Sequence, residues 1–411
     1  MKARKLAIIG VGNRGRGLAR LAVRSGQPVE IAGLVEPDAA TLHAAADEFH
    51  VLASSCFTCH ESLLESAIDF DAAIVATDVR THARIACDCL NAGLPIYLEK
   101  PMTRTINEAI EVYATARSTR VPLVVGFNLR FAPFYKRLKE LISAGAVGQI
   151  ISIEWKEVLS AAAWADGYCR STWYSRKKDV GGWLLEKSCH DIDQINWLAG
   201  APCERVASFG SRRYFVPRED VPQRCTDGCP IESRCYFSCF KLHPDGPASL
   251  PHYVPAEHWD LCVYHSGSDL VDRQVAILEY ENGVTAAFSL LPIGNHWERL
   301  MRICGSEATI RGSDHRNEIH IYPHDRAEPI VEDPPQSGGG HGGADPQIVS
   351  AFLRFLDDPS QSFEITVEAG LESMLSAGGI EMAREQNQLV ELGNFREGSR
   401  GIDLENSTHG F

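Results

Sequence analysis

The stretch Leu6-Ala-Ile-Ile-Gly-Val-Gly-Asn-Arg-Gly15 decides the fold of this chain. It is an apolar run that breaks into glycines and resumes as a helical pattern over residues 18–23, so Gly10, Gly12 and Gly15 stand in G-x-G-x-x-G register. The three glycines permit a tight turn, the approach of a pyrophosphate to the backbone, and close packing of a helix on a strand. The first helical amides would then face the phosphate oxygens. The stretch predicts a dinucleotide-binding domain in which Asn13 and Arg14 also contact the cofactor.

Glu36 is the second signal for a dinucleotide. An expected strand over residues 29–36 ends at this carboxylate, about 20 positions beyond Gly15, where an acidic side chain can bond the adenosine ribose hydroxyls. A 2'-phosphate beside it would be repelled, so the sequence favours NAD. Arg14 leaves some room for NADP. The alternative for the whole stretch is a glycine-rich turn in another kind of α/β protein.

Length and charge narrow the class of protein. The 411 residues, 44% hydrophobic and 23% charged, suffice for two or three domains. No run approaches the roughly 18 uninterrupted apolar residues of a membrane span. The first residues lead into a strand without a signal-peptide pattern, so a cytoplasmic location is expected. A net charge of −14 argues against nucleic acid or an anionic membrane as a partner.

The first part of the chain alternates expected strands with expected helices, which is typical of a doubly wound parallel sheet. Ligands bind such sheets beyond the carboxyl ends of the strands. After the first two strands, the expected strand ends lie at Thr77, Glu99 and Gly126.

Two further motifs carry a family resemblance. They are the triplet Glu99-Lys-Pro101 and the later pattern Gly181-Gly-x-Leu-x-Glu-x-x-x-His-Asp191. Together with the glycine motif and Thr77, and in this order, they make the chain resemble the Gfo/Idh/MocA oxidoreductase family over most of its length. The resemblance implies an α/β protein with an N-terminal Rossmann domain over residues 1–126. A C-terminal α/β domain over residues 127–395, with an open, mostly antiparallel sheet, would bind substrate and form a homo-oligomer, and residues 396–411 would be a tail.

The resemblance also implies roles for individual residues. Lys100 would lie between nicotinamide and substrate, with a cis bond before Pro101, and His190 would be the catalytic histidine. The other residues expected along the cofactor are Thr77, His82, Glu99, Asn128 and Arg130. Without the resemblance, Lys100 would be an ordinary lysine after a strand.

Glu186 and His190 are four residues apart, so on a helix they share one face. A carboxylate beside an imidazole sets its tautomer and stabilises its charged form, as a general base for an alcohol proton requires. Lys100 would stabilise the negative charge that develops on the oxygen. The alternative is a buried structural histidine bonded to Glu186. The common dehydrogenases of the family have Asp at the position of Glu186, so this residue and its neighbour Lys187 depart from their pattern.

An aromatic and basic stretch over residues 164–178 could bind a sugar ring, particularly one with an anionic group, because aromatic faces and cations alternate in it. The alternative is a solvated loop. The candidate substrate contacts are Tyr168, Arg170, Trp173, Tyr174, Arg176 and Lys177, with Lys187 and His190 beyond the stretch. His341, in a glycine-rich loop, resembles the loop histidine of family members that act on glycosides, and Asp345 is expected to cap the following helix.

The segment 203–262 is an insert rich in cysteine and proline. Cys225-x3-Cys229-x5-Cys235-x3-Cys239 contains two pairs at spacings seen in zinc sites, although five residues between the pairs are few for a zinc finger. A structural zinc ion and free thiols are the main interpretations. An iron–sulfur cluster and disulfides are the others. The total of 13 cysteines is odd, which argues against full pairing.

These features together predict an NAD-dependent oxidoreductase that acts on a sugar, sugar acid or polyol by hydride transfer. The alternative is an NAD-requiring oxidative glycosidase, which oxidises its substrate transiently, eliminates the aglycone, adds water and reduces the product. A third hypothesis is a sensor of NAD or sugar that catalyses no reaction.

Overall fold

The computed structural model describes residues 3–172, 174–251, 253–336, 338, 340–358 and 363–396. Its chain forms two compact units. The first contains Met1–Glu140, Pro334–Leu375 and Gly393–Phe411, and the second contains Leu141–Asp333 and Ser376–Leu392. The division differs from the expected single boundary after residue 126, because residues 334–375 return to the first unit. Trp173 and nearly all of the expected tail lie outside the described residues.

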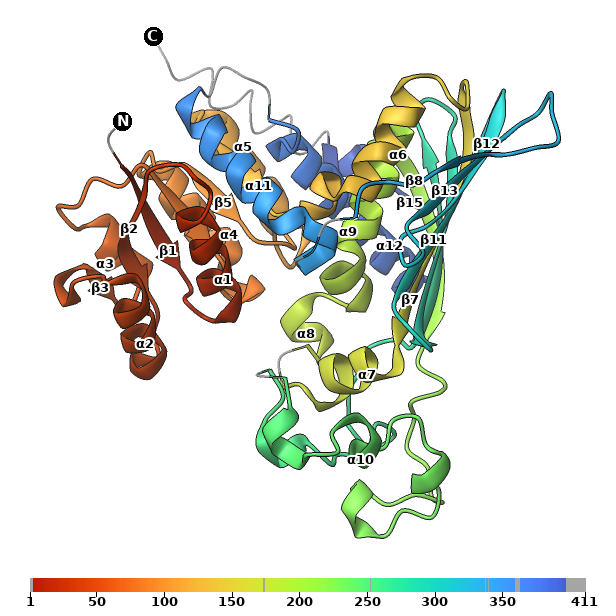
Figure 1. The fold of residues 1–411 in the computed structure, drawn as a ribbon, viewed down its shortest axis with the longest axis horizontal. Coiled ribbons are helices and arrows are strands. Elements are labelled where there is room, and N and C mark those ends of the chain that lie inside the picture. The colour runs from red at the N-terminus through yellow and green to blue at the C-terminus, as the bar shows by residue number, and fades with distance from the viewer. Residues whose placement is uncertain are drawn as a thin grey trace. The chain divides into compact units, whose positions relative to one another are not determined.

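The first unit is built on a six-stranded sheet in the order β3-β2-β1-β4-β5-β6. Figure 1 labels β1, β2, β3 and β5 of this sheet. All of its strand pairs are parallel, as expected for a doubly wound sheet. The strands are β1 (Arg4–Ile9), β2 (Val29–Val35), β3 (Cys56–Phe57), β4 (Ala72–Val75), β5 (Ile96–Leu98) and β6 (Leu123–Val125). Consecutive residues of β1 and β4 are buried because helices cover both faces.

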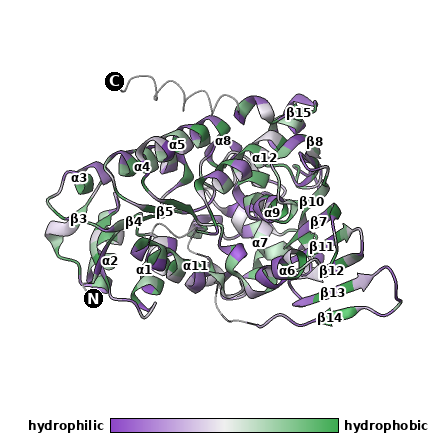
Figure 2. Cartoon of the chain, turned by 90° about the horizontal axis from the view of Figure 1, so that it is seen from above, coloured by the Kyte–Doolittle hydropathy of each residue, from purple (hydrophilic) through white to green (hydrophobic). Residues whose placement is uncertain are grey.

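Helices flank this sheet on both sides (Figure 2), with α4 and α5 in contact on one side and α1 and α11 in contact on the other. They are α1 (Asn13–Val23), α2 (Ala39–Phe49), α3 (His60–Leu64), α4 (Val79–Asn91), α5 (Ile106–Thr119) and α11 (Gly340–Asp357). Short 3₁₀ turns are η1 (Ala53–Ser55) and η2 (Asn128–Phe131). Local sequence fixes the helix starts: a Thr105–Glu108 capping box begins α5, and the Asp78 carboxylate accepts from Arg80 N–H at α4.

The second unit contains an open nine-stranded sheet in the order β14-β13-β12-β11-β7-β10-β9-β8-β15. Only β7 and β10 pair in parallel, so the sheet is mostly antiparallel, as predicted. The strands are β7 (Ile150–Ser160), β8 (Cys203–Ser211), β9 (Arg273–Tyr280), β10 (Thr285–Gly294), β11 (Glu298–Gly305), β12 (Ala308–Ser313), β13 (Glu318–Pro323), β14 (Ile330–Glu332) and β15 (Val390–Glu391). Strands β9 and β10 form a hairpin that turns at Asn282-Gly283.

Strand β9 shows how this sheet has one packed face and one open face. Leu278 and Tyr280 are buried, whereas the alternate residues Val275 and Ile277 are exposed. Helix α9 (Trp183–Ala199) contacts β7 and β10. The other helical elements are α6 (Pro133–Ser143) and α12 (Val367–Gln386), both of which run from one unit into the other, and the short helices α7 (Ala161–Trp164), α8 (Lys177–Val180) and α10 (Cys239–Leu242).

The insert between β8 and β9 has little regular structure. It contains four short 3₁₀ turns, η4 (Cys225–Asp227), η5 (Glu232–Arg234), η6 (Gly246–Ser249) and η7 (Ala256–His258), besides α10. Among the described helices of the chain, none is both long and apolar enough to cross a membrane.

Candidate active site

The glycine turn of the first unit has the geometry of a pyrophosphate cradle. A Cβ at Gly15 would lie 1.9 Å from the carbonyl oxygen of Gly10, so only glycine allows α1 to begin this close to β1. A Cβ at Gly12 would meet nothing within 4 Å, so its backbone faces open space. Asn13 begins α1, and no side chain caps this helix end. The residues therefore fit an anionic phosphate bound by backbone amides.

Glu36 lies beside this turn at the carboxyl end of β2. Its carboxylate accepts the Val11 N–H at 3.2 Å and the Asp38 N–H at 3.3 Å. These bonds hold a negative charge next to the turn, at the place where the sequence predicted a contact with ribose hydroxyls.

Arg14 is engaged inside the first unit. Its Nε donates to Glu99 at 2.8 Å, and its two terminal nitrogens donate to the two oxygens of Asp345, each at 2.9 Å. Burial alone would lower the pKa of Arg14, but the carboxylates of Glu99 and Asp345 raise it overall. Because two carboxylates hold the guanidinium, its donors are not available to bind the 2'-phosphate of NADP.

Asp345, expected only as a helix cap, links several predicted cofactor residues. Its Oδ1 accepts from Asn128 Nδ2 at 2.6 Å, and its Oδ2 lies 3.1 Å from His341 Nδ1. Burial acts to raise the pKa of Asp345, but His341 and Arg14 hold it below the usual value of an aspartate. His341 begins a run of three residues with left-handed φ, continued by Gly342 and Gly343, which precedes the regular part of α11.

His82, which is 1% exposed, contacts the segments that follow β4 and β5. One ring nitrogen lies 2.9 Å from the carbonyl oxygen of Pro101 and the other lies 3.2 Å from that of Thr77. Burial lowers the pKa of His82, which favours the neutral ring. The Lys100–Pro101 bond is cis, as the resemblance implied. The N–H of Lys100 donates to Glu99 at 3.1 Å.

Asn128 and Arg130 lie on η2, immediately after β6, and both are buried. Arg130 donates to the carbonyl oxygen of Glu364 at 2.9 Å. The returning segment 334–375 therefore supports η2 through Asp345 and Glu364. Sequence analysis missed this support, because the pattern of a helix does not reveal which unit it packs on.

In the second unit, α9 carries Glu186 and His190 one turn apart, and both are buried, at 8% and 3% exposed. The Tyr168 hydroxyl donates to Glu186 Oε2 at 2.7 Å. Burial and the Glu186 carboxylate raise the pKa of Tyr168 well above its ordinary value, so this phenol stays a proton donor. Tyr168 comes from a π-helical turn, η3 (Ala165–Arg170), which brings it to α9.

A buried charge cluster lies on the same unit. Glu157 on β7 accepts from Lys187 Nζ at 3.0 Å and from Arg299 at 2.9 Å. Arg299 also donates to Asp191 at 2.8 Å, and the Lys187 ammonium sits 4.1 Å from the centre of the Trp297 ring. Sequence analysis missed Glu157 and Arg299. The only signal for them in the sequence was the alternation of buried and exposed positions along β7 and β11. Glu157 and Arg299 each occupy a position on the buried face.

Each carboxylate of this cluster responds differently to its surroundings. Burial raises the pKa of Asp191, and the neighbouring Glu157 adds to the effect. Burial acts in the same direction on Glu157, but Arg299 and Lys187 overcome it and keep its pKa below the usual value. Asp191 therefore keeps its proton to a higher pH than Glu157, which stays ionised beside Arg299 and Lys187.

The aromatic and basic stretch does not form one surface. Arg170 is fully buried and donates to the carbonyl oxygens of Leu261 and Phe237 and to Asp166, so it supports the insert. Arg176 donates to the Gly267 carbonyl oxygen, and Lys177 forms an ion pair with Glu385. The ring of Tyr174 lies edge-on to Tyr253.

The four cysteines of the predicted metal motif, Cys225, Cys229, Cys235 and Cys239, lie in the insert, and all are free thiols. Three of them line one cavity, together with Cys262.

The fold and site define a class of protein: a Rossmann unit with an open phosphate cradle, followed by an open mixed sheet whose covering helix carries a buried Glu and His. This is the arrangement of a protein with a dinucleotide-binding domain and a second α/β domain.

Family models agree. The model of an oxidoreductase family with an NAD-binding Rossmann fold matches residues 4–127, and that of the GFO/IDH/MocA C-terminal domain matches residues 135–311. The chain belongs to the Gfo/Idh/MocA oxidoreductase family, and its first unit is an NAD-binding Rossmann domain.

Individual relatives are distant. YteT of Bacillus subtilis, named as an oxidoreductase, is 25% identical over 340 residues, which cover 75% of this chain and 78% of that protein. Inositol 2-dehydrogenase of Corynebacterium glutamicum is 27% identical over 202 residues, 49% of this chain and 55% of that one. The structure of levoglucosan dehydrogenase with NADH and levoglucosan has a TM-score of 0.74 and 18% identity, and covers 95% of this chain and all of that one. This last likeness shows a shared fold.

Proposed function

We propose that the protein is an NAD-dependent dehydrogenase that oxidises a hydroxyl-bearing carbon of a sugar, sugar acid or polyol. The observation that carries the proposal is the buried pair on α9, in which Glu186 and His190 share a helix face and the Tyr168 hydroxyl fixes Glu186 at 2.7 Å. Two relatives support the substrate class, since one is named as an inositol dehydrogenase and the other as a levoglucosan dehydrogenase.

In this proposal the first unit selects and holds NAD. Amides at the start of α1 would bind the pyrophosphate, and Glu36 would bind the adenosine ribose. The engagement of Arg14 by Glu99 and Asp345 favours NAD over NADP. The remaining cofactor contacts proposed are Asn13, Thr77, His82, Asn128 and Arg130. Bound NAD⁺ would supply the acceptor for the hydride that leaves the substrate carbon.

Side chains of the protein accept the hydroxyl proton of the substrate and stabilise the charge that develops on its oxygen. His190 accepts the proton of the hydroxyl that is oxidised, and the Glu186 carboxylate stabilises the resulting imidazolium. Tyr168 keeps Glu186 in position through its hydrogen bond. The ammonium of Lys100 stabilises the negative charge that develops on the substrate oxygen.

Substrate contacts are proposed for residues around α9 and in the first unit. The candidates are Tyr168, Tyr174, Arg176, Lys177, Lys187, His190 and His341. We leave out Arg170 because its donors serve the insert. The cations among the candidates, Arg176, Lys177 and Lys187, contact Gly267, Glu385 and Glu157, so a carboxylate on the sugar would compete with these partners.

A second candidate function, NAD-requiring glycoside hydrolysis, is favoured by His341, whose ring faces the Asp345 carboxylate at 3.1 Å while its side chain is 41% exposed. An imidazole oriented in this way could assist the departure of an aglycone. This reaction ends with the substrate carbon restored to its original oxidation state, so it consumes no NAD overall.

One experiment separates these functions. The protein with NAD⁺ is incubated with a panel of sugars, sugar acids, inositols and aryl glycosides, while nicotinamide absorbance and free aglycone are followed together. Steady NADH formation supports the dehydrogenase. Aglycone release without NADH supports the glycosidase. Binding of both ligands with neither product would contradict both and support a sensor.

We also propose that the protein forms a homo-oligomer through the open face of the nine-stranded sheet. Phe209, Val275 and Ile277 are 69%, 47% and 60% exposed, and β8 pairs with β9 so that Phe209 stands opposite Val275. Exposed apolar side chains that adjoin across strands are typical of a protein contact.

A further inference from the structure

The insert brings distant cysteines to one place through its backbone. Arg224 and Leu261 form an antiparallel bridge. On either side of it, the N–H of Cys225 donates to the Asp260 carbonyl oxygen at 2.8 Å, and the N–H of Cys262 donates to that of Gln223 at 2.9 Å. Cys225 and Cys262 therefore lie on neighbouring chain segments, although the sequence motif did not include Cys262.

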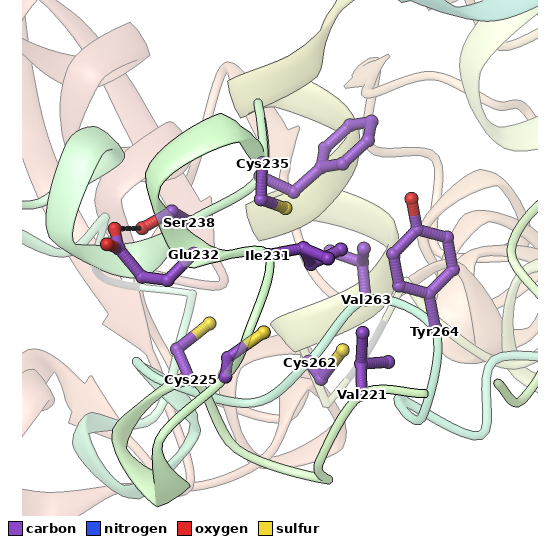
Figure 3. Close-up of a pocket in the computed structure, with 11 residues that line it drawn as sticks. Val221, Cys225, Ile231, Glu232, Cys235, Ser238, Cys262, Val263 and Tyr264 are labelled. Atoms are coloured by element: carbon purple, nitrogen blue, oxygen red, sulfur yellow. Dashed lines mark hydrogen bonds between the residues drawn. The ribbon is translucent and has the colours of Figure 1, made fainter. Parts of the chain in front are cut away.

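Two successive turns supply the other side. The N–H of Glu232 donates to the Cys229 carbonyl oxygen, and the N–H of Cys235 donates to that of Glu232, both at 3.2 Å. These turns carry Cys229 and Cys235 to the same cavity as Cys225 and Cys262. Figure 3 labels Cys225, Cys235 and Cys262 around this cavity. The cavity's apolar lining comes from Val221, Ile231, Phe237, Val263 and Tyr264.

Cys239 is placed differently from the other four. It is fully buried and is not among the residues that line the cavity. Three cysteines of the sequence motif therefore line the cavity and the fourth, Cys239, does not.

We propose that Cys225, Cys229, Cys235 and Cys262 are the four thiolate ligands of a metal centre in the insert. Four thiolates are a complete donor set for zinc and for an iron–sulfur cluster. Cys229 is followed by Pro230, and a Cys-x3-Cys-Pro sequence also occurs in bacterial iron–sulfur motifs. The ligand set differs from the sequence prediction in one member, because Cys262 takes the place of Cys239.

The sulfur spacing bears on which metal is bound. Tetrahedral zinc requires thiolate sulfurs about 3.8 Å apart, given zinc–sulfur bonds of about 2.3 Å. Among the described residues, three potential ligand atoms lie within 4.8 Å of one another only at His60, Glu61 and Asp88. Zinc would therefore have to draw the insert's thiols closer together, whereas an iron–sulfur cluster holds its cysteines farther apart. The experiment below distinguishes the two.

The centre is coupled to the α9 site through Arg170. Arg170 donates to the carbonyl oxygens of Phe237 and Leu261, which are next to or close to cavity cysteines in the chain. It belongs to the same π-helical turn as Tyr168, whose hydroxyl holds Glu186. We expect metal loss to loosen this turn and weaken substrate binding, an expectation that rests on the proposed function.

The test measures metal content on the full-length protein, so it does not depend on the enzyme's activity. Wild-type protein is made with zinc and iron supplied, purified without oxygen, and analysed by mass spectrometry for metals and by visible absorbance. About one zinc per chain, or about four irons with charge-transfer absorbance, is expected. Cys262→Ser should retain less than about a tenth of the wild-type metal. Cys239→Ser, the matched variant, should retain most of it, as should Cys304→Ser on β11.

Several results would overturn the ligand set. Wild-type protein with less than about a tenth of an equivalent of either metal would do so, and so would disulfides among the four cysteines in protein kept without oxygen. Loss of metal in Cys239→Ser together with retention in Cys262→Ser would restore the set predicted from sequence. Because a variant can fail to fold, the wild type is also titrated with a thiol-binding mercurial. Metal release should coincide with modification of about four thiols, and release without thiol modification would contradict the proposal.

Discussion

Buried polar side chains set the chemistry of this protein, and each is held by a specific partner. Tyr168 fixes Glu186, Asp345 fixes Arg14 and Asn128, and His82 joins the ends of β4 and β5. The Glu–His spacing and the Glu-Lys-Pro triplet could be recognised from the sequence because the motif residues are close together along the chain. Asp345 and Glu157 could not, since their partners come from distant segments.

Replacing His190 or Lys100 tests the proposed chemistry at single residues. His190→Ala should lower kcat by ~10²–10⁴, because it removes the base for the hydroxyl proton, and Lys100→Ala should lower it because charge on the oxygen is no longer stabilised. The NAD dissociation constant of His190→Ala, measured by calorimetry, should stay near that of wild type. His43→Ala is the control, since its side chain is 80% exposed. Full turnover in both site variants would refute the assignment.

Asp345→Asn should destabilise the first unit in a pH-dependent way. The folded-state pKa of Asp345 is lowered, so its contribution is present above the unfolded pKa of about 4 and is lost as the pH falls through the folded pKa. We expect a loss of about 2 kcal/mol at pH 7, less than for a fully buried pair because the Arg14 side chain is 33% exposed. Urea unfolding measures it. The difference from wild type should shrink below about pH 4.

The variant Asp325→Asn is the control for that experiment, because Asp325 is exposed. A difference between wild type and Asp345→Asn that stayed constant from pH 7 to pH 2 would show that the carboxylate's charge does not matter for the stability of this unit.

At the level of elements, the first unit follows from its sequence almost completely. Each expected strand lies in the predicted parallel sheet, because the alternation of buried strands and helices permits few arrangements. For the second sheet, the family resemblance implied the open, mostly antiparallel character that the structure shows. The placement of α11 was not predicted, because an apolar helix face does not by itself specify the sheet on which the helix packs. The fold of the insert was not predicted either, because its sequence lacks a periodic pattern.

Glycine substitutions in the β1–α1 turn separate folding from cofactor binding. Gly12→Ala should fold normally, since its Cβ meets nothing within 4 Å, but should weaken NAD binding about tenfold or more because a methyl group occupies the path of the phosphate. Gly15→Ala should lower the free energy of unfolding by about 1–3 kcal/mol through its clash with Gly10. Calorimetry and urea unfolding distinguish the two effects.

Gly17→Ala is the matched control on the same helix, where a Cβ also meets nothing within 4 Å. It should leave NAD binding unchanged and stabilise α1 by about 0.5–1 kcal/mol. Equal NAD affinity in Gly12→Ala and Gly17→Ala would argue against a phosphate at Gly12.

At the level of the whole molecule, the open face of the second unit's sheet predicts association. Ile277→Lys should raise the dissociation constant of the assembly by roughly 30-fold or more, because a charge replaces an apolar side chain at the centre of the exposed row. Light scattering after gel filtration measures the mass. Leu52→Lys, at a residue 74% exposed in the first unit, should not change it. A monomeric wild-type protein at micromolar concentration would refute the proposed oligomer.

The chain passes between its two units at four places, after Glu140, Asp333, Leu375 and Leu392. Neither unit is therefore a continuous cassette that recombination could exchange in a single event. A gene fragment ending at residue 140 would encode the phosphate turn without Asp345, the partner that Arg14 requires. We therefore expect a chimaera that joins residues 1–140 of one relative to the remainder of another to fail, unless segment 334–375 comes from the same relative as residues 1–140. Cofactor preference and substrate preference would then be inherited together.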